Sequence, residues 1–309
     1  MSPPPGEVVE FVLGGAARIP LDDWPVFRVR GKDANDLLSR LSTNDFAPLG
    51  RGEGVTTAFL TPEGTVTHLA HLSPDGDGLR AVTQPGSEES FPAWIDRYTF
   101  VEDCRVELAD DLRAAWRVGT ELGDPLASDD LLETDHVFGP VAGRVLSGPT
   151  DALAAALDGR DEPVLDAEAV EQLRVECGVP AFGKELHDKR HALEGGLMPF
   201  VSFTKGCYTG QEVVARQDTY DKVVRRLVGF VFAGRPEPGE ALVDVGTKTS
   251  VTTVGSTPAT AAPADWPDGP ACLGFVGRKH ADDGTAVVTA SGLTGRVVEL
   301  PFPRLRSGA

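Results

Sequence analysis

The first third of the chain alternates short strand patterns with amphipathic helix patterns. Val26 to Arg30 alternates apolar and polar positions, which predicts a strand, and Ala34 to Leu41 repeats apolar side chains at the spacing of one helical face. Val55 to Leu60 and Thr65 to Leu72 predict the two strands of a hairpin, because the turn Thr61-Pro62-Glu63-Gly64 separates them. Strand pairs with helices on one face are typical of an α+β arrangement of the split-βαβ, ferredoxin-like type.

The pattern changes in the second half of the chain. Asp166 predicts the N-cap of a helix that ends at Gly178, where a glycine can adopt the left-handed conformation. From about Leu227 onward, runs of Val, Thr and Phe alternate with Gly and Pro turns, and helix patterns are weak. This C-terminal region therefore predicts a small β-barrel or sandwich.

The composition is typical of a globular protein with a large excess of acidic groups. The 309 residues include 29 Lys and Arg against 47 Asp and Glu, which gives a formal charge of −18. Nucleic acids and anionic membranes bind cationic faces, so this charge argues against both as partners. No apolar run approaches the ~18 residues of a membrane-spanning helix, and we expect no signal peptide from the N-terminal pattern.

Four cysteines, Cys104, Cys177, Cys207 and Cys272, lie 73, 30 and 65 residues apart. This spacing favours neither a zinc site nor an iron–sulfur site within the chain, and it is not typical of a disulfide scaffold. We therefore expect that the cysteines are free thiols, that no metal is bound and that the protein is cytoplasmic.

The charge balance reverses between Arg174 and Arg235. That span holds ten basic and seven acidic residues, a balance of +3, which leaves −21 for the rest of the chain. A cationic region in an anionic protein is a candidate site for a small anionic ligand. A solvated, charged face is the alternative interpretation.

The stretch from Lys205 to Arg216, KGCYTGQEVVAR, carries the strongest candidate chemistry. Thr209 and Glu212 have the spacing of a capping box, which predicts a helix that begins at Thr209, two residues after Cys207. The positive end of that helix and the side chain of Lys205 would stabilise a thiolate. Cys207 is therefore the candidate reactive thiol, with Lys205 beside it. The alternative is a packed cysteine next to a structural cap.

This motif, Lys-Gly-Cys-Tyr-x-Gly-Gln-Glu, resembles that of the YgfZ-type folate-binding family, which is related to the glycine-cleavage T-protein, an aminomethyltransferase. Further stretches extend the resemblance over nearly the whole chain. They are Arg30 to Asp45, Phe59 to Gly64, Leu173 to Gly183 and Glu194 to Leu197.

The resemblance implies a three-lobed ring of the T-protein type, with tetrahydrofolate bound in a central channel. It implies that Glu194 accepts hydrogen bonds from the pterin ring, since a carboxylate can accept two N–H bonds at once. Arg174 and Arg216 are candidate partners for the folate carboxylates or for positioning Glu194. Tyr208 and Gln211 of the motif are further candidate folate contacts.

The resemblance also implies three structural units. Residues 1–50 together with 164–225 would form the folate-binding lobe that carries the motif. Residues 51–163 would form a ferredoxin-like lobe, and residues 226–309 would form the C-terminal β-barrel.

His68 marks a departure from the aminomethyltransferases, which have an aspartate at this point of the strand after the first hairpin. A histidine can move protons but is not an anion that would stabilise an iminium, so His68 argues against aminomethyl transfer. We keep His68 as a candidate folate contact, with a hydrogen-bonded sheet histidine as the alternative. His71 is expected on the opposite face of the strand.

The leading functional hypothesis that the resemblance implies is a tetrahydrofolate-binding accessory protein in iron–sulfur cluster assembly or repair. Its partners would be folate and iron–sulfur client proteins or assembly factors. A folate-dependent aminomethyl or one-carbon transferase and a non-catalytic folate-binding scaffold are the alternatives. Whether the protein is an enzyme is left open, because the sequence identifies no reaction, client or folate form.

Overall fold

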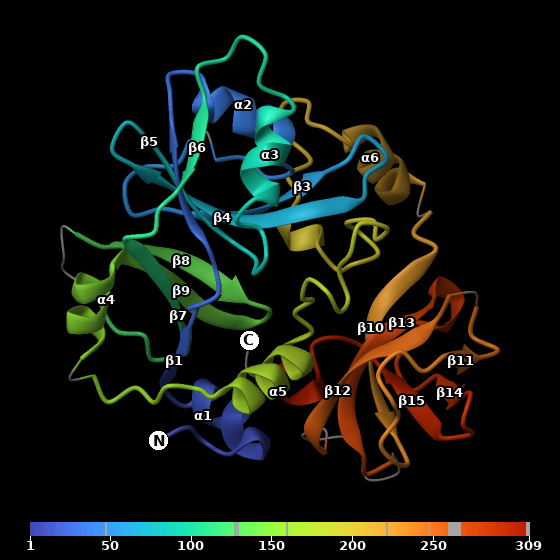
Figure 1. The fold of residues 1–309 in the computed structure, drawn as a ribbon. Coiled ribbons are helices and arrows are strands. Elements are labelled where there is room, and N and C mark those ends of the chain that lie inside the picture. Colours follow the sequence, from blue (N-terminus) through green and yellow to red (C-terminus); the bar gives the residue numbers. More distant parts are fainter. Residues whose placement is uncertain are drawn as a thin grey trace.

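The computed structural model describes residues 1–46, 48–126, 130–158, 160–220, 222–246, 248–258 and 267–306. These residues form three lobes, each built around its own sheet (Figure 1). Two lobes combine a sheet with helices, and the third consists mainly of strands. This arrangement confirms the predicted α+β class.

The first lobe contains a five-stranded sheet in the order β3-β4-β5-β2-β6. Helices α2 (Ala34–Leu41) and α3 (Ser90–Asp96) cover one face of this sheet, where Phe27, Phe59 and Phe91 pack together. The apolar stripe predicted on α2 is buried there. The strands are β2 (Val26–Arg30), β3 (Val55–Leu60), β4 (Val66–Asp75), β5 (Gly78–Thr83) and β6 (Arg105–Leu108).

The second lobe contains a four-stranded antiparallel sheet in the order β1-β7-β9-β8. Its strands are β1 (Ala16–Pro20), β7 (Leu112–Gly119), β8 (Leu132–Phe138) and β9 (Val141–Pro149). Helices α1 (Val8–Leu13) and α4 (Thr150–Leu157) pack beside it.

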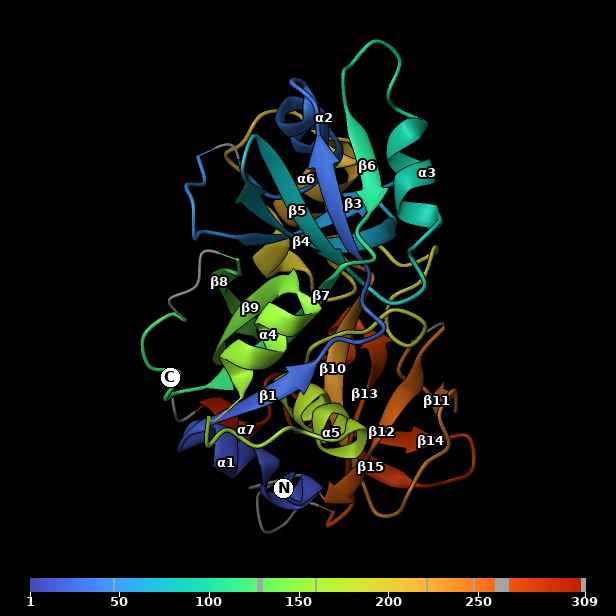
Figure 2. The ribbon, with the colours of Figure 1, turned by 60° about the vertical axis from the view of Figure 1, so that its left-hand side comes forward.

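Helix α5 (Ala167–Cys177) lies between the second lobe and the barrel strands (Figure 2). The side chain of Asp166 accepts a hydrogen bond from the Ala169 N–H, and Gly178 ends the helix with a φ of 74°. Both predicted ends of this helix are therefore confirmed. Among the described residues, none of the helices has the length and apolar character needed to cross a membrane.

The third lobe is a six-stranded antiparallel sheet in the order β11-β14-β15-β10-β13-β12. A bridge between Ala241 and Ser250 joins its two edges, so the sheet closes into the predicted barrel. A short helix, α7 (Pro303–Arg306), follows it. The strands are β10 (Arg225–Phe232), β11 (Leu242–Val243), β12 (Ser250–Pro258), β13 (Pro270–Gly277), β14 (Ala286–Thr289) and β15 (Thr294–Val298).

The sheets do not follow all of the unit boundaries expected from the sequence. Strand β2, within residues 1–50, pairs with β5 and β6, so the first sheet crosses the expected boundary at residue 50. The second sheet joins β1 to β7, β8 and β9 in the same way. The start of the barrel at Arg225 lies next to the expected residue 226.

The chain between α5 and α6 (Gln211–Thr219) runs from the barrel back to the first lobe. Its apolar side chains cover the face of the first sheet that α2 and α3 leave open. Thr65 bridges His191, and the Val66 N–H donates to the Arg190 carbonyl. This segment therefore brings the resemblance motifs of both halves of the chain onto one hairpin.

Candidate functional site

The motif segment, Lys205 to Arg216, is fixed on the first lobe through its backbone. The Thr209 N–H donates to the Arg40 carbonyl at 3.0 Å, at the end of α2. Gly210 has a φ of 82°, and a Cβ at this position would lie 2.7 Å from the Thr61 carbonyl oxygen. Because a side chain would collide with the hairpin turn, glycine is required here. Motifs far apart in the sequence thus meet at one corner of the first lobe.

The predicted capping box is wrong. Helix α6 begins at Gln211, and its N-cap is Gly210, without a side-chain cap. Gly210 turns the chain at the hairpin, and Arg40 already accepts from the Thr209 N–H, so a cap at Thr209 does not form. Cys207 lies three residues before the N-cap, outside the first turn, where the helix dipole acts.

Lys205 does not have the role expected from its position near Cys207. Its Nζ donates to the carbonyl oxygens of Ser39 at 2.7 Å, Ser42 at 3.0 Å and Asn44 at 2.7 Å. Burial lowers the pKa of this ammonium group to about 8. An ammonium group has three N–H donors, and all three are used at the end of α2. Lys205 is therefore a structural cap in this arrangement.

Cys207 is an exposed free thiol. The other three cysteines are less accessible, and burial raises the pKa of Cys104 to about 11 and that of Cys272 to about 12. Reactivity follows exposure and thiolate character. By exposure, Cys207 is the thiol best placed to meet another molecule.

Tyr208 and Gln211, the two candidate folate contacts of the motif, have different surroundings. Tyr208 is buried in the apolar cluster between the hairpin and the motif segment, and burial raises its pKa to about 12. Gln211 is half-buried at the first position of α6, and its N–H donates to the Tyr208 carbonyl. Tyr208 therefore serves the core, whereas the side chain of Gln211 is partly accessible.

Glu194 is the centre of a buried charged cluster. Its side chain is 2% exposed, and its Oε2 lies 3.1 Å from Nη2 of Arg225 and 3.5 Å from Nη1 of Arg190. The Arg190 guanidinium lies over the Phe275 ring, 3.5 Å from the ring centroid. Burial and the nearby Arg225 lower the pKa of Arg190. The Glu194 cluster, meaning Arg190, Glu194 and Arg225, thus holds two guanidinium groups against one carboxylate.

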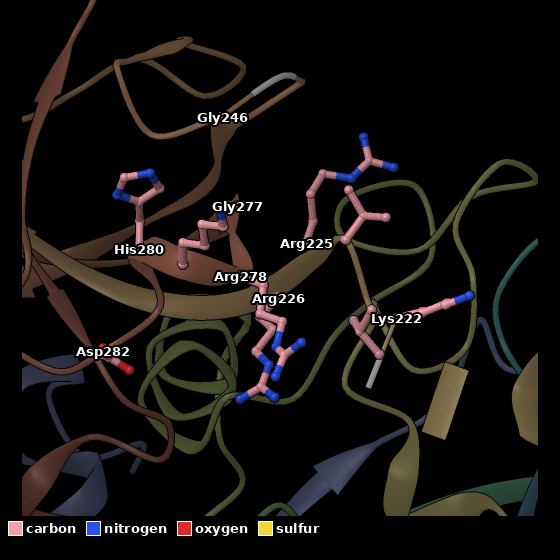
Figure 3. Close-up of a pocket in the computed structure, with 11 residues that line it drawn as sticks. Lys222, Arg225, Arg226, Gly246, Gly277, Arg278, His280 and Asp282 are labelled. Carbon is pink, nitrogen blue, oxygen red and sulfur yellow. The ribbon is translucent and has the colours of Figure 1, made fainter. Parts of the chain in front are cut away.

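A cavity of about 980 Å³ opens beside this cluster, and Arg225 belongs to both (Figure 3). Residues 222–226, which lead into β10, and the turn that follows β13 provide most of its lining. Cations dominate among the charged and titratable lining residues, which are Lys222, Arg225, Arg226, Arg278, Lys279, His280 and Asp282.

The sequence identified part of this cavity. The cationic span from Arg174 to Arg235 includes the residues that β10 contributes. It missed Arg278 and Lys279, which reach the cavity because β13 pairs with β10. The basic run from Arg278 to His280 was the available signal, but its partner strand could not be deduced from the sequence.

Arg174 and Arg216 are not brought to Glu194. Arg174 is buried against α5 and the barrel, where its guanidinium pairs with Glu171 and Glu185 at 2.8 Å each. Arg216 is exposed on α6. Among the described residues, the ion-pair partners of Glu194 are Arg190 and Arg225. Arg174 and Arg216 therefore do not position Glu194, and their contact with the folate carboxylates stays a prediction.

His68 lies on the other face of the first sheet from the motif segment. Its ring packs against Phe91 and Trp94, with centroids 5.4 and 6.2 Å apart, and Nε2 is 3.1 Å from Oγ of Ser90. Burial lowers its pKa to about 4. His71 instead contacts Thr134 in the second lobe. The structure thus separates His68 from Glu194 and gives it the surroundings of a sheet histidine.

Comparisons with known proteins agree with this fold. No protein-family model matches the chain. A chloroplastic Arabidopsis thaliana protein described as a putative transferase is 25% identical, over 96% of this chain and 73% of its own length. The tRNA-modifying protein YgfZ of an Enterobacter species is 26% identical, over 77% of this chain and 79% of its own length.

Aminomethyltransferases are similar in both sequence and structure. That of Rubrobacter xylanophilus is 28% identical, over 89% of this chain and 80% of its own length. The solved structure of the glycine-cleavage aminomethyltransferase T from Bartonella henselae matches with a TM-score of 0.79, at 18% identity, over 98% of this chain and 91% of the other. The fold is therefore that of the glycine-cleavage T-protein. Together with the relatives, it confirms the expected resemblance: the chain is similar in sequence to YgfZ proteins and aminomethyltransferases, and its fold is T-protein-like.

Proposed function

We propose that this protein binds tetrahydrofolate at Glu194 and acts as an accessory protein in iron–sulfur cluster assembly or repair, with Cys207 as its reactive thiol. The observation that carries the folate part is the buried Glu194 carboxylate at the edge of a large cationic cavity. The carboxylate is buried between two guanidinium groups beside an open cavity, and an acceptor in this place favours a ligand that donates hydrogen bonds.

The residues of the Glu194 cluster fit a pterin. Three bonds from Arg190 and Arg225, 3.1 to 3.5 Å long, reach the Glu194 carboxylate, which offers about four acceptor positions, so one position remains for an N–H donor. A second N–H donor would replace one of the two longer bonds. The two guanidinium groups pair with the Glu194 carboxylate and orient it. Tetrahydrofolate would supply a carrier for a one-carbon group. Arg225 takes the positioning role that the sequence assigned to Arg174 or Arg216.

The thiol part of the proposal depends on exposure and on the motif resemblance. Cys207 is accessible, whereas the side chain of Lys205 is engaged at the end of α2. An exposed thiol can meet a protein client or a cluster-derived sulfur species without a conformational change. Cytoplasmic location and iron–sulfur clients are parts of the same proposal.

Complementation tests the iron–sulfur part. In a strain that lacks this protein and has low iron–sulfur enzyme activity, the wild type and Cys104→Ala should restore activity, whereas Cys207→Ala should not. Full restoration by Cys207→Ala would reject the thiol and favour a folate-binding scaffold. Failure of the wild type would reject the iron–sulfur role.

A folate-dependent one-carbon transferase is the second candidate, because relatives of matching length are aminomethyltransferases and share the fold. The buried His68, where those enzymes have an aspartate, argues against it. Formation of methylene-tetrahydrofolate from an aminomethyl or N-methyl donor by the purified protein would replace the accessory role with this one.

A further inference from the structure

The cavity next to the Glu194 cluster concentrates positive charge in a chain whose formal charge is −18. We propose that this cavity binds a small ligand with at least two anionic oxygen groups, carboxylates or phosphates. The ligand is either the oligoglutamyl tail of a folate bound at Glu194 or a separate phosphorylated molecule. The inference concerns the barrel side of the cavity: the folate-tail alternative rests on the proposed folate binding at Glu194, whereas the phosphorylated ligand does not.

The first argument is the charge of the lining. Five of its described side chains are Lys or Arg, and Asp282 is its single carboxylate. These cations come from residues 222–226 and 278–279, which the sequence separates by more than fifty positions. The pairing of Arg225 with Gly277 and the bond from the Arg278 N–H to the Val224 carbonyl hold the two segments together. Like charges brought together by the fold indicate an anionic partner.

The second argument is the spread of the cations around the cavity. Figure 3 shows the side chains of Arg226 and Arg278 extending in the same direction, with Arg225 and Lys222 directed elsewhere. The groups therefore do not converge on one point. A spread of this kind suits several anionic groups along one ligand better than a single small ion, because each guanidinium can bind its own pair of oxygens.

The third argument comes from the buried cluster at the cavity edge. Glu194 neutralises one of its two guanidinium groups, which leaves an excess of positive charge in a buried place. Arg190 is 8% exposed, and among the described residues its Nε has no hydrogen-bond partner. An anion bound near Arg225 would offset this excess charge.

The cavity wall on the barrel side is formed by backbone. Gly246 has a φ of 111°, and a Cβ there would lie 3.2 Å from Cα of Gly277. A Cβ at Gly277 would lie 2.9 Å from the Val245 carbonyl oxygen. The two turns pack so closely that neither tolerates a side chain without a shift. The cations on the turn after β13 are therefore presented from a fixed backbone.

Calorimetry with three probes tests the proposal: tripolyphosphate, tetrahydrofolate with one glutamate, and tetrahydrofolate with five glutamates. The cavity variant is Arg278→Ala with Lys279→Ala. The control is Lys32→Ala with Arg97→Ala, which removes the same charge from exposed positions in the first lobe. A melting curve for each variant confirms that it folds.

We expect the cavity to increase the binding affinity of at least one polyanionic probe. Either tripolyphosphate binds, or the pentaglutamate binds more tightly than the monoglutamate. The cavity variant should weaken that probe about tenfold, the low end for charge-assisted bonds at exposed positions, and added salt should weaken it further. The control variant should bind as the wild type does. Binding of tripolyphosphate identifies a phosphorylated ligand, and a gain only for the pentaglutamate identifies the folate tail.

Two results would overturn the inference. One is that the wild type neither binds tripolyphosphate nor binds the pentaglutamate more tightly than the monoglutamate. The other is that the cavity and control variants weaken binding equally, which would mean that net charge alone attracts the probes. Binding of the monoglutamate reports on Glu194 separately, so the failure of one site can be distinguished from that of the other.

Discussion

Lys205 illustrates at the scale of one residue how a motif side chain can serve the fold. Its ammonium group binds three carbonyl oxygens at and just beyond the end of α2, where a helix leaves its acceptors without partners. The motif segment is therefore tied to the first lobe by a side chain as well as by its backbone.

Replacement of this lysine tests that role. Lys205→Met keeps the length of the side chain but leaves the carbonyl groups of Ser39, Ser42 and Asn44 without their donor. We expect the free energy of unfolding to fall by about 2–3 kcal/mol in urea denaturation. The rate of Cys207 alkylation by iodoacetamide at pH 7 should change less than about twofold, because the ammonium is engaged elsewhere. A large drop in the alkylation rate with unchanged stability would instead mean that Lys205 stabilises the Cys207 thiolate.

At the scale of an element, α5 packs apolar side chains on the second lobe and is held to the barrel through buried charge. Arg174 on α5 pairs with Glu185, which is fully buried and also accepts bonds from the hydroxyl groups of Thr252 and Thr253 on β12. Nearby Arg174 and Lys184 lower the pKa of Glu171 to about 2, against the effect of its own burial. These contacts explain why Arg174 is held away from Glu194.

Two arginine variants separate the structural position from the exposed one. Arg174→Met leaves the buried Glu185 without its cation, so we expect a loss of about 3–5 kcal/mol in the free energy of unfolding. Arg216→Met removes an exposed cation from α6 and should cost less than about 0.5 kcal/mol. Urea denaturation of both variants provides the measurement. Equal effects would contradict this assignment.

At the scale of the whole molecule, the buried His71 and the half-buried His136 join the first and second lobes. Oγ1 of Thr56 lies 3.1 Å from Nδ1 of His71 and 3.0 Å from Nδ1 of His136, and Nε2 of His71 lies 2.7 Å from Oγ1 of Thr134. Burial lowers the pKa of His136 to about 4 and that of His71 well below its usual value. The two rings remain neutral in the folded protein at neutral pH.

This contact predicts a pH dependence of stability. Below about pH 6.5, the pKa of a histidine in the unfolded chain, the unfolded chain binds protons that the folded chain excludes. The free energy of unfolding therefore decreases as the pH is lowered. Between pH 6.5 and pH 5, each of these histidines should lower the free energy of unfolding by about 2 kcal/mol. The carboxylates with lowered pKa values lose their contribution only below about pH 4.5. The urea midpoint should change less with pH in the double variant His71→Gln, His136→Gln than in the wild type or in His280→Gln. An unchanged slope would contradict this account.

Several elements could be predicted from the sequence because their causes are local. The apolar stripe of α2, the Asp166 cap of α5 and the turn at Thr61 to Gly64 depend on neighbouring residues, and the structure confirms all three. The capping box at Thr209 also looked local. It failed because a tertiary contact with the hairpin placed Gly210 at the start of α6.

The sequence predicted several residues of the candidate site but not which of them pair with one another. Glu194 and the cationic span were identified, but Arg190 and Arg225 as partners of Glu194 depend on β10 lying beside the segment that crosses to the first lobe. The addition of Arg278 depends on the β10–β13 register. Sequence spacing carries no information on such contacts between distant segments.

Titration of the protein with tetrahydrofolate by calorimetry tests the central claim most directly, with the wild type, Glu194→Gln and Glu212→Gln compared. Glu212 is an exposed carboxylate of the motif and serves as the matched control. We predict binding to the wild type and to Glu212→Gln, and an affinity about tenfold or more lower for Glu194→Gln, the cost of a lost charged acceptor. An absence of binding to the wild type, or equal affinity for a folded Glu194→Gln, would contradict the account.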